Sequence, residues 1–298
     1  MILLTGATGF LGSSLLKRLL AEGYEVCCMK RSTSNCWRVK EVMDRCTWYN
    51  VWGGGVERVF KENRIQMIIH CATDYGRTGE NNIHVYRSNV SFPLEILDEA
   101  MKFGCKYFIN TDSFFCKQID NLWKEKELYM DTYTKSKYMF RNIVKEQIDN
   151  LEIIFINMQL EHIYGKDDKK EKFVSFLLGA LQSNTKEIEL TDGKQTRDWI
   201  YLGDVIDAYM AVIQNLYKFK AGEYYQFEVG TGREISLREF VIEAKKITKS
   251  TTELKFGRKQ MAANELMRSC ADNATLQELG WKPKFGIMRG LKEIVGEK

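Results

Sequence analysis

The chain has 298 residues, of which 44% are hydrophobic and 28% are charged, a composition typical of a folded globular protein and not of a disordered one. The 44 basic and 40 acidic residues leave a formal charge of only +4, which argues against a dedicated nucleic-acid-binding protein. The sequence contains no apolar run of about 18 residues, so we predict no membrane span. The eight cysteines form no CxxC pair and the three histidines show no ligand spacing. We therefore predict reduced thiols, a cytoplasmic location and no metal site.

Apolar runs of strand length alternate with amphipathic stretches of helix length through the first half of the chain. The predicted strands are Ile2–Thr5, Tyr24–Met29, Met67–Ala72, Tyr107–Asn110 and Ile153–Met158. The predicted helices are Leu11–Ala21, Val56–Asn63, Val90–Phe103 and Tyr133–Gln147. This alternation predicts the α/β class, with a Rossmann-type doubly wound parallel sheet covered by helices on both faces.

The regular alternation of predicted strands and helices ends after about residue 160, and a charged, irregular segment follows. We predict a dinucleotide-binding domain made of residues 1–164 plus about 198–230. A smaller substrate-binding domain is predicted for residues 165–197 plus 231–298.

The first predicted strand runs directly into a glycine-rich turn that opens the first helix. Gly6 permits the tight turn, Gly9 lets the backbone approach a pyrophosphate, and Gly12 lets the helix pack closely on the strand. The helix N-terminus then offers free amides and a positive dipole to the phosphates. Because the triplet lies between a strand and a helix, it predicts a dinucleotide site. The residues predicted to bind the cofactor there are Gly6, Thr8, Gly9, Phe10, Leu11 and Gly12.

The second predicted strand is followed by Lys30, Arg31 and Ser32, where an NAD enzyme usually has an acidic residue for the ribose 2′-hydroxyl. Two cations at this point suit a 2′-phosphate instead. The sequence therefore favours NADP(H), with Arg31 and Ser32 as its contacts.

Tyr133 and Lys137 have i, i+4 spacing on a predicted helix, which places them on one face. An ammonium beside a phenol favours the phenolate and lowers the phenol pKa from about 10 towards the working range. We therefore predict that Tyr133 is a proton donor and that Lys137 assists it.

Together these motifs resemble the extended short-chain dehydrogenase/reductase family, which contains nucleotide-sugar epimerases, dehydratases and reductases. The resemblance spans essentially the whole chain and adds cofactor contacts at Ala72, Thr73 and Asn89, besides Tyr133 and Lys137. It implies that Thr111 completes a Thr–Tyr–Lys catalytic set and that Arg197 binds the substrate pyrophosphate.

The chain departs from the family pattern on one loop. The family often has Arg where this chain has Gln159, Asn where it has His162, and Pro where it has Lys166. Two interpretations of His162 remain open: a donor to a substrate phosphate, or a structural histidine.

The residues after Thr111 separate the possible reactions. Sugar 4,6-dehydratases resemble one another in a Thr-Asp-Glu triplet, whereas this chain has Thr111-Asp112-Ser113 and so lacks one acid. Epimerase-reductases of the GDP-fucose type have a Cys at the position of Ser113. Three hypotheses remain open: a ketoreductase, a 4-epimerase with tightly bound NAD, and a non-catalytic NADP(H)-binding protein.

The strings IIHCATDYG, FINTDSFF, NMQLEHIYG and GKQTRDWIY resemble most the bacterial CDP-abequose and CDP-paratose synthase group of nucleotide-sugar 4-ketoreductases. This resemblance implies reduction of a CDP-linked deoxyhexose by NADPH during O-antigen and lipopolysaccharide biosynthesis. It also implies a homodimer formed through helices 90–103 and 133–147. The residues expected to bind the nucleotide-sugar substrate are Asp74, Tyr75, Asp112, Ser113, His162, Arg197 and Glu265.

Overall fold

The computed structural model describes residues 1–76, 82–117, 131–262 and 265–296, which form two compact units. The first unit comprises Met1–Gln159 and Gln214–Phe227. The second comprises Leu160–Ile213 and Glu228–Lys298. Among the described residues, no helix has both the length and the apolar character needed to cross a membrane.

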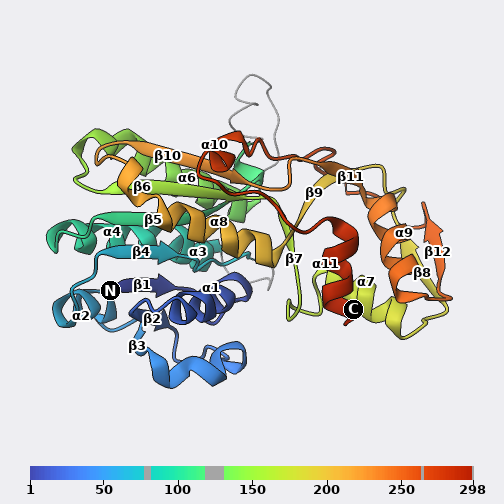
Figure 1. The fold of residues 1–298 in the computed structure, drawn as a ribbon, viewed down its shortest axis with the longest axis horizontal. Coiled ribbons are helices and arrows are strands. Elements are labelled where there is room, and N and C mark those ends of the chain that lie inside the picture. The colour runs from blue at the N-terminus through green and yellow to red at the C-terminus, as the bar shows by residue number, and fades with distance from the viewer. Residues whose placement is uncertain (77–81, 118–130, 263–264, 297–298) are drawn as a thin grey trace. The chain divides into compact units, whose positions relative to one another are not determined.

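A seven-stranded sheet with the order β10-β6-β5-β4-β1-β2-β3 organises the first unit (Figure 1). The pairs β1–β2, β1–β4, β2–β3 and β4–β5 are all parallel. The strands are β1 (Ile2–Thr5), β2 (Val26–Lys30), β3 (Thr47–Asn50), β4 (Met67–His70), β5 (Tyr107–Ser113), β6 (Ile154–Leu160) and β10 (Tyr224–Val229). Their near-continuous apolar sequences fit a sheet that is buried on both faces.

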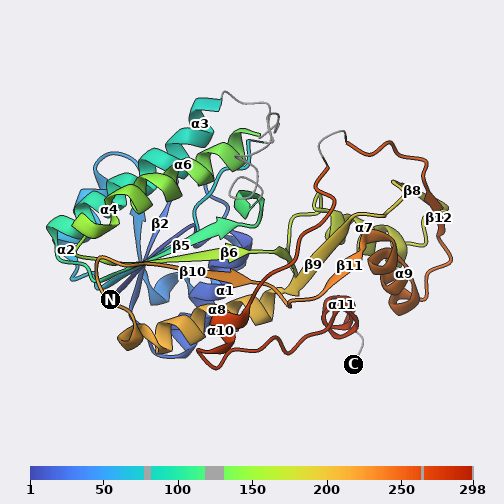
Figure 2. The same ribbon diagram turned by 90° about the horizontal axis from the view of Figure 1, so that it is seen from above.

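Helices cover both faces of this sheet. Figure 2 shows α2, α4 and α6 on one face and α1 on the other. On the first of these faces, Val59, Ile96 and Phe140 pack against Phe108 and Phe155 of the strands. The helical segments of this unit are α1 (Phe10–Ala21), η1 (Trp37–Arg45), α2 (Gly55–Glu62), α3 (Asn82–Tyr86), η2 (Arg87–Ser91), α4 (Phe92–Lys102), α6 (Thr132–Gln147), η3 (Ile148–Asn150) and η4 (Leu216–Lys218).

The predicted fold class is confirmed, and the first predicted strand has the predicted bounds. Two strands of the sheet were missing from the prediction. In the edge strand β3 only Tyr49 is buried, so its sequence has no apolar run to detect. The residues of strand β10 are mostly half-buried, so this strand too lacks a continuous apolar run. The strand β5 also runs to Ser113, three residues beyond the predicted end, and therefore includes Thr111 and Asp112.

The second unit contains a three-stranded sheet, β11-β9-β7, and a two-stranded sheet, β12-β8. Its elements are β7 (His162–Tyr164), α7 (Phe173–Gln182), β8 (Glu187–Leu190), β9 (Thr196–Tyr201), α8 (Leu202–Gln214), β11 (Glu234–Ser236), α9 (Leu237–Thr248), β12 (Glu253–Phe256), α10 (Ala274–Gln277) and α11 (Ile287–Val295). Residues 198–213, predicted for the first domain, fall in this unit. The reason is that β9 pairs with β7 and β11, while Asp204 of α8 accepts hydrogen bonds from the backbone amides of Lys284 and Phe285.

Candidate active site

The glycine turn lies at the point where the strand order reverses, between β1 and β4, which is where open α/β sheets bind ligands. Gly6 has φ of +67°, and a Cβ there would lie 2.6 Å from the backbone nitrogen of Ala72. A Cβ on Gly12 would lie 2.2 Å from the carbonyl oxygen of Gly6. No larger residue fits either position without movement of the backbone. The turn is therefore packed against the segment that follows β4.

The residues around this turn fit a dinucleotide. Helix α1 begins after Gly9, which is exposed and in an extended conformation, with no side chain capping the helix and no acidic residue in its first turn. Its first amides and its dipole are thus available to an anion such as a pyrophosphate. Arg31 and Ser32 follow β2 with exposed side chains, as a contact to a 2′-phosphate requires.

Tyr133 and Lys137 of α6 both reach the end of β5. The Lys137 ammonium donates a hydrogen bond to the backbone oxygen of Thr111 at 2.8 Å. The Tyr133 phenol is hydrogen-bonded to the Ser113 side chain. The Thr111 hydroxyl donates to the sulfur of Cys71 at 3.3 Å. The structure therefore brings the predicted Thr–Tyr–Lys set together and adds Ser113 as a direct partner of the phenol.

Burial decides the charge state of this pair. It raises the pKa of the Tyr133 phenol well above its ordinary value; the nearby Tyr75 adds to the rise, and the hydrogen bond with Ser113 opposes it. Burial also lowers the pKa of Lys137, while the Asp112 carboxylate opposes that shift. The Tyr133 pKa therefore lies above its ordinary value instead of near the working range, because desolvation is the largest effect; the predicted influence of Lys137 on the phenolate stays a prediction. The phenol holds its proton, as a proton donor must.

The loop after β4 is held against α6 by Asn89. The side-chain oxygen of Asn89 accepts from the Thr73 hydroxyl and the Asp74 amide, and its nitrogen donates to the Asp74 carbonyl and the Ser136 hydroxyl. Asn89 lies in the π-turn η2, and such turns redirect a side chain within a helix. The predicted cofactor contact of Asn89 is thus corrected: all four hydrogen-bonding positions of its amide are used within the protein.

The same loop places Tyr75 against the candidate proton donor. The rings of Tyr75 and Tyr133 are stacked with their centroids 4.9 Å apart. The Asp74 carboxylate accepts from the Gly76 amide at 2.9 Å, which stabilises the turn of this loop. Tyr75 is 42% exposed, so its ring covers Tyr133 on one side and faces solvent on the other.

Asp112 faces into the protein, contrary to the expectation that it contacts the sugar. It is 3% exposed. One carboxylate oxygen accepts from the Ser113 amide and the Cys116 thiol, and the other from the Asn157 side chain at 2.9 Å. That second oxygen also lies 3.7 Å from the Arg141 guanidinium. The alternation of side chains along β5 explains the correction, because Asp112 points to the face opposite Thr111 and Ser113.

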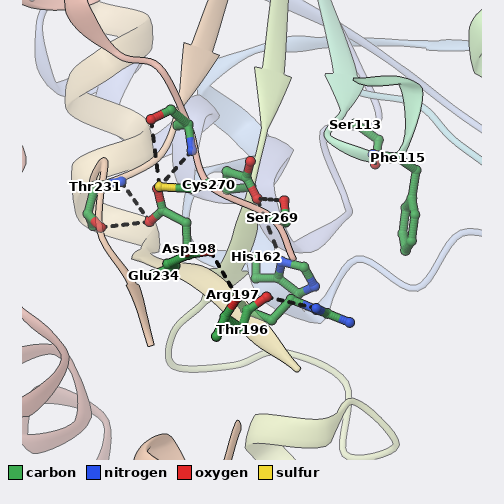
Figure 3. A network of polar contacts seen from close by, with 12 residues as sticks. Ser113, Phe115, His162, Thr196, Arg197, Asp198, Thr231, Glu234, Ser269 and Cys270 are labelled. Atoms are coloured by element: carbon green, nitrogen blue, oxygen red, sulfur yellow. Dashed lines mark hydrogen bonds and ion pairs between the residues drawn. The ribbon is translucent and has the colours of Figure 1, made fainter. Parts of the chain in front are cut away.

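The remaining predicted substrate residues, His162, Arg197 and Glu265, lie in the second unit. Figure 3 shows His162 beside Arg197. Arg197 of β9 is 5% exposed and donates to Glu265 at 2.5 Å and to the Thr196 carbonyl at 2.8 Å. His162 of β7 lies beside Glu161, with 3.8 Å between its ring nitrogen and the carboxylate. Arg197, Glu265 and His162 thus form one polar cluster, to which Glu161 and its hydrogen-bond partner Ser269 also belong.

His162 is neutral in this cluster. Burial lowers its pKa to about 3, and the positive charge of Arg197 adds to that effect. The imidazole is therefore uncharged near neutral pH, and both interpretations left open by the sequence, a donor to a substrate phosphate and a structural histidine, stay predictions. A neutral imidazole still donates one N–H.

The depressed pKa of His162 predicts a specific loss of stability in acid. Below about pH 6.5 the unfolded chain protonates this histidine, whereas the folded chain does not until about pH 3. Stability linked to the group is therefore present above pH 6.5 and lost as the pH falls through that window. Between pH 7 and pH 5, we expect the wild type to lose about 2 kcal/mol more unfolding free energy than His162→Gln. Urea unfolding at both pH values measures this, and equal losses in the two proteins would contradict the assignment.

Several residues of the site escaped the sequence analysis. Arg141 follows Lys137 by four residues on the same helix face, a spacing that would have placed it beside the pair. Asn157 interrupts an apolar strand, and a polar residue there signals a buried partner. For Ser136 and Glu161 we find no comparable signal in the sequence.

Comparison with known proteins agrees with this geometry. Residues 2–230 match the model of the NAD dependent epimerase/dehydratase family. The chain is 34% identical to CDP-abequose synthase of Salmonella muenchen, over 100% of this chain and 97% of that protein. It is 32% identical to CDP-abequose synthase of Salmonella typhimurium, over 99% of this chain and 97% of that protein.

Solved structures share the fold at low sequence identity. UDP-glucose 4-epimerase with UDP-glucose from Thermotoga maritima superimposes with a TM-score of 0.84 at 21% identity, covering 99% of this chain and 97% of that one. UDP-glucose 4-epimerase in complex with NAD from Thermus thermophilus gives a TM-score of 0.81 at 20% identity, covering 99% and 98%. The family match, the full-length relatives and the shared fold agree with the resemblance inferred from the motifs. The chain belongs to the NAD dependent epimerase/dehydratase family.

Proposed function

We propose that this protein uses NADPH to reduce the 4-keto group of a CDP-linked 6-deoxy- or 3,6-dideoxyhexose, in the biosynthesis of a bacterial surface polysaccharide. The observation that carries the proposal is the meeting of Tyr133 and Lys137 with the end of β5, in a chain 34% identical to a CDP-abequose synthase. The base and the sugar are taken from that relative's name.

The proposed chemistry needs one proton and one hydride. NADPH, when bound, would supply the hydride that C4 accepts. Tyr133 donates its phenolic proton to the carbonyl oxygen as that oxygen gains negative charge. The Thr111 hydroxyl, which donates to Cys71 in the structure, would turn to donate to the same oxygen together with the Ser113 hydroxyl. The Lys137 charge would favour the phenolate that remains. The glycine turn, with Thr8, Arg31, Ser32, Ala72 and Thr73, would bind NADPH.

The position of Asp112 argues against dehydration. Elimination of water from a sugar needs an acid and a base at the substrate, and Ser113 already replaces one of the two acids. The Asp112 carboxylate is occupied by the Ser113 amide, Cys116, Asn157 and Arg141. A carboxylate so engaged is a poor proton donor to a bound sugar.

We assign the substrate diphosphate to Arg197, with Glu265 and neutral His162 as neighbouring contacts, and the sugar to Asp74, Tyr75 and Ser113. The assay that tests the substrate class follows NADPH oxidation with CDP-, dTDP- and GDP-linked 4-keto-6-deoxyhexoses. We expect the CDP-linked ketosugar to give the highest kcat/KM. Equal turnover of all three substrates would contradict the proposed preference for CDP but would still support the proposed ketoreduction.

The second candidate function is a 4-epimerase with tightly bound NAD. The observation behind this alternative is the fold that the chain shares with UDP-glucose 4-epimerases. Arg31 after β2 favours a reductase, because a cation there suits the 2′-phosphate of NADP(H). An epimerase would be purified with NAD and would interconvert sugars without net consumption of NADPH.

We also propose a homodimer in the cytoplasm. Ile83 of α3 and Met139 of α6 are 47% and 46% exposed, and these two helices contact each other within the protomer. Exposed apolar side chains on and beside α6, one of the two helices predicted to form the interface, suit a symmetric helix-to-helix contact. Light scattering should give twice the 34.7 kDa mass of the chain, and a monomer at micromolar concentration would contradict the proposal.

A further inference from the structure

Three consecutive residues at the end of β5 are each held by a side chain of α6. The holding side chains, Tyr133, Lys137 and Arg141, follow one another at intervals of four residues and therefore lie on one face of the helix. Lys137 contacts Thr111, and Tyr133 contacts Ser113. The third contact joins Arg141 to the residue between them, Asp112, at 3.7 Å.

The Arg141–Asp112 pair is unusual because it is completely buried. The exposed fraction of both side chains is 0%. The carboxylate is held further by the Asn157 side chain, which in turn accepts from Asn110 of β5 at 2.7 Å. Burying an ion pair costs several kcal/mol of desolvation for each charge, so such a pair adds little net stability over apolar residues of the same size. A role beside the candidate proton donor gives a reason for this arrangement.

We propose that Arg141 and Asp112 form a buried charge clamp, which positions the end of β5 against Tyr133 and Lys137. The inference rests on the proposed ketoreduction and assigns to both residues a positioning role rather than contact with the substrate. The Ser113 amide donates to Asp112 at 2.8 Å, so the clamp also fixes the residue that contacts the phenol.

The electrostatic part of the proposal follows from the charges around Lys137. Asp112 raises the Lys137 pKa against the lowering effect of burial. Arg141 carries a like charge one helical turn along α6, so we expect its repulsion to act in the opposite direction to Asp112. Among the residues that the structure describes, the other titratable groups facing Lys137 and Tyr133 are His70 of β4, Cys71 and Tyr75 after β4, and Cys116 after β5. Burial keeps His70 neutral and keeps the Cys71 and Cys116 thiols protonated, which leaves Asp112 and Arg141 as the charges that oppose each other here.

The clamp predicts opposite pH shifts for its two members. Loss of the Lys137 proton should set the alkaline limb of kcat for ketosugar reduction. Asp112→Asn removes the carboxylate that attracts the Lys137 ammonium. We therefore expect the midpoint of this limb to move to a lower pH, by about one pH unit. Arg141→Met removes the like charge and leaves Asp112 uncompensated, so the limb should move up by a similar amount. The double variant should return close to the wild-type position. Each single variant should lose about tenfold or more in kcat through misplacement of β5, with NADPH affinity nearly unchanged.

The control is Val144→Ala, which removes two methyl groups from the same helix in a buried position without touching the clamp. It should lower the melting temperature and leave the pH profile unchanged. Shifts of the two single variants in the same direction, or no shift, would overturn the proposal. A double variant whose alkaline limb is shifted as far as that of either single variant would also overturn it. If Arg141→Met does not fold, Arg141→Lys keeps the charge and should retain the wild-type limb. If Tyr133→Phe is inactive while the clamp variants show no shift, the proposed function stands and this inference fails.

Discussion

Replacement of Tyr133 by Phe is expected to lower kcat for ketosugar reduction by about a hundredfold to ten-thousandfold, the usual contribution of a positioned proton donor. The phenol is the group that α6 brings to Ser113 at the end of β5, and its raised pKa means that it carries a proton near neutral pH. The ring should remain stacked on Tyr75, so the loss should fall on kcat and not on KM. Steady-state NADPH oxidation measures both parameters.

The matched control is Tyr138→Phe, which removes a phenol oxygen from the same helix beside Lys137. This variant should keep kcat within a few-fold of the wild type. Fluorescence titration should give the same NADPH affinity for both variants. A Tyr133→Phe protein as active as the wild type would remove Tyr133 from the chemistry and favour the non-catalytic alternative.

Replacement of Arg31 by Ala is expected to raise KM for NADPH by about tenfold to a hundredfold and to leave KM for NADH nearly unchanged. A charge-assisted hydrogen bond to a phosphate contributes about 1.5–3 kcal/mol, which corresponds to that range. The exposed guanidinium after β2 is available for this contact. Initial rates with each cofactor, at a saturating concentration of the ketosugar, measure the change in preference.

Arg58→Ala serves as the control, because Arg58 is an exposed cation of the same unit that pairs with Glu62 on α2. Its removal should change neither KM. An Arg31→Ala protein that still prefers NADPH to the wild-type extent would place the 2′-phosphate elsewhere. Wild-type protein that is purified with NAD and does not respond to NADPH would instead support the epimerase.

The parts of the site that could be predicted from sequence are those fixed by local geometry. The spacing of Gly6, Gly9 and Gly12 between a strand and a helix determines the turn, and the structure shows why no Cβ fits at two of the three. The i, i+4 spacing of Tyr133 and Lys137 likewise determines their common face. Such features depend on a few neighbouring residues, so the pattern in the chain is sufficient.

The parts that could not be predicted depend on contacts distant in sequence. Asn89 lies 47 residues from Ser136, and a π-turn decides where its amide points. The family resemblance implied that Asp112 contacts the sugar, and the predicted strand ended at Asn110, before the residue whose direction is in question. The observed strand continues to Ser113, and its alternation turns Asp112 towards Arg141. The charge state of His162 likewise depends on burial, which no local pattern in the sequence reveals.

The most direct test of ketoreduction is to follow the hydride itself. The protein is incubated with a CDP-linked 4-keto-6-deoxyhexose and NADPH that carries deuterium at both C4 positions of the nicotinamide, and the product sugar is examined by NMR and mass spectrometry. The account predicts one deuterium, located at C4 of the product, and one NADPH oxidised for each sugar reduced. A product that contains no deuterium, or a 4-hydroxyl sugar that is inverted without any consumption of NADPH, would contradict it.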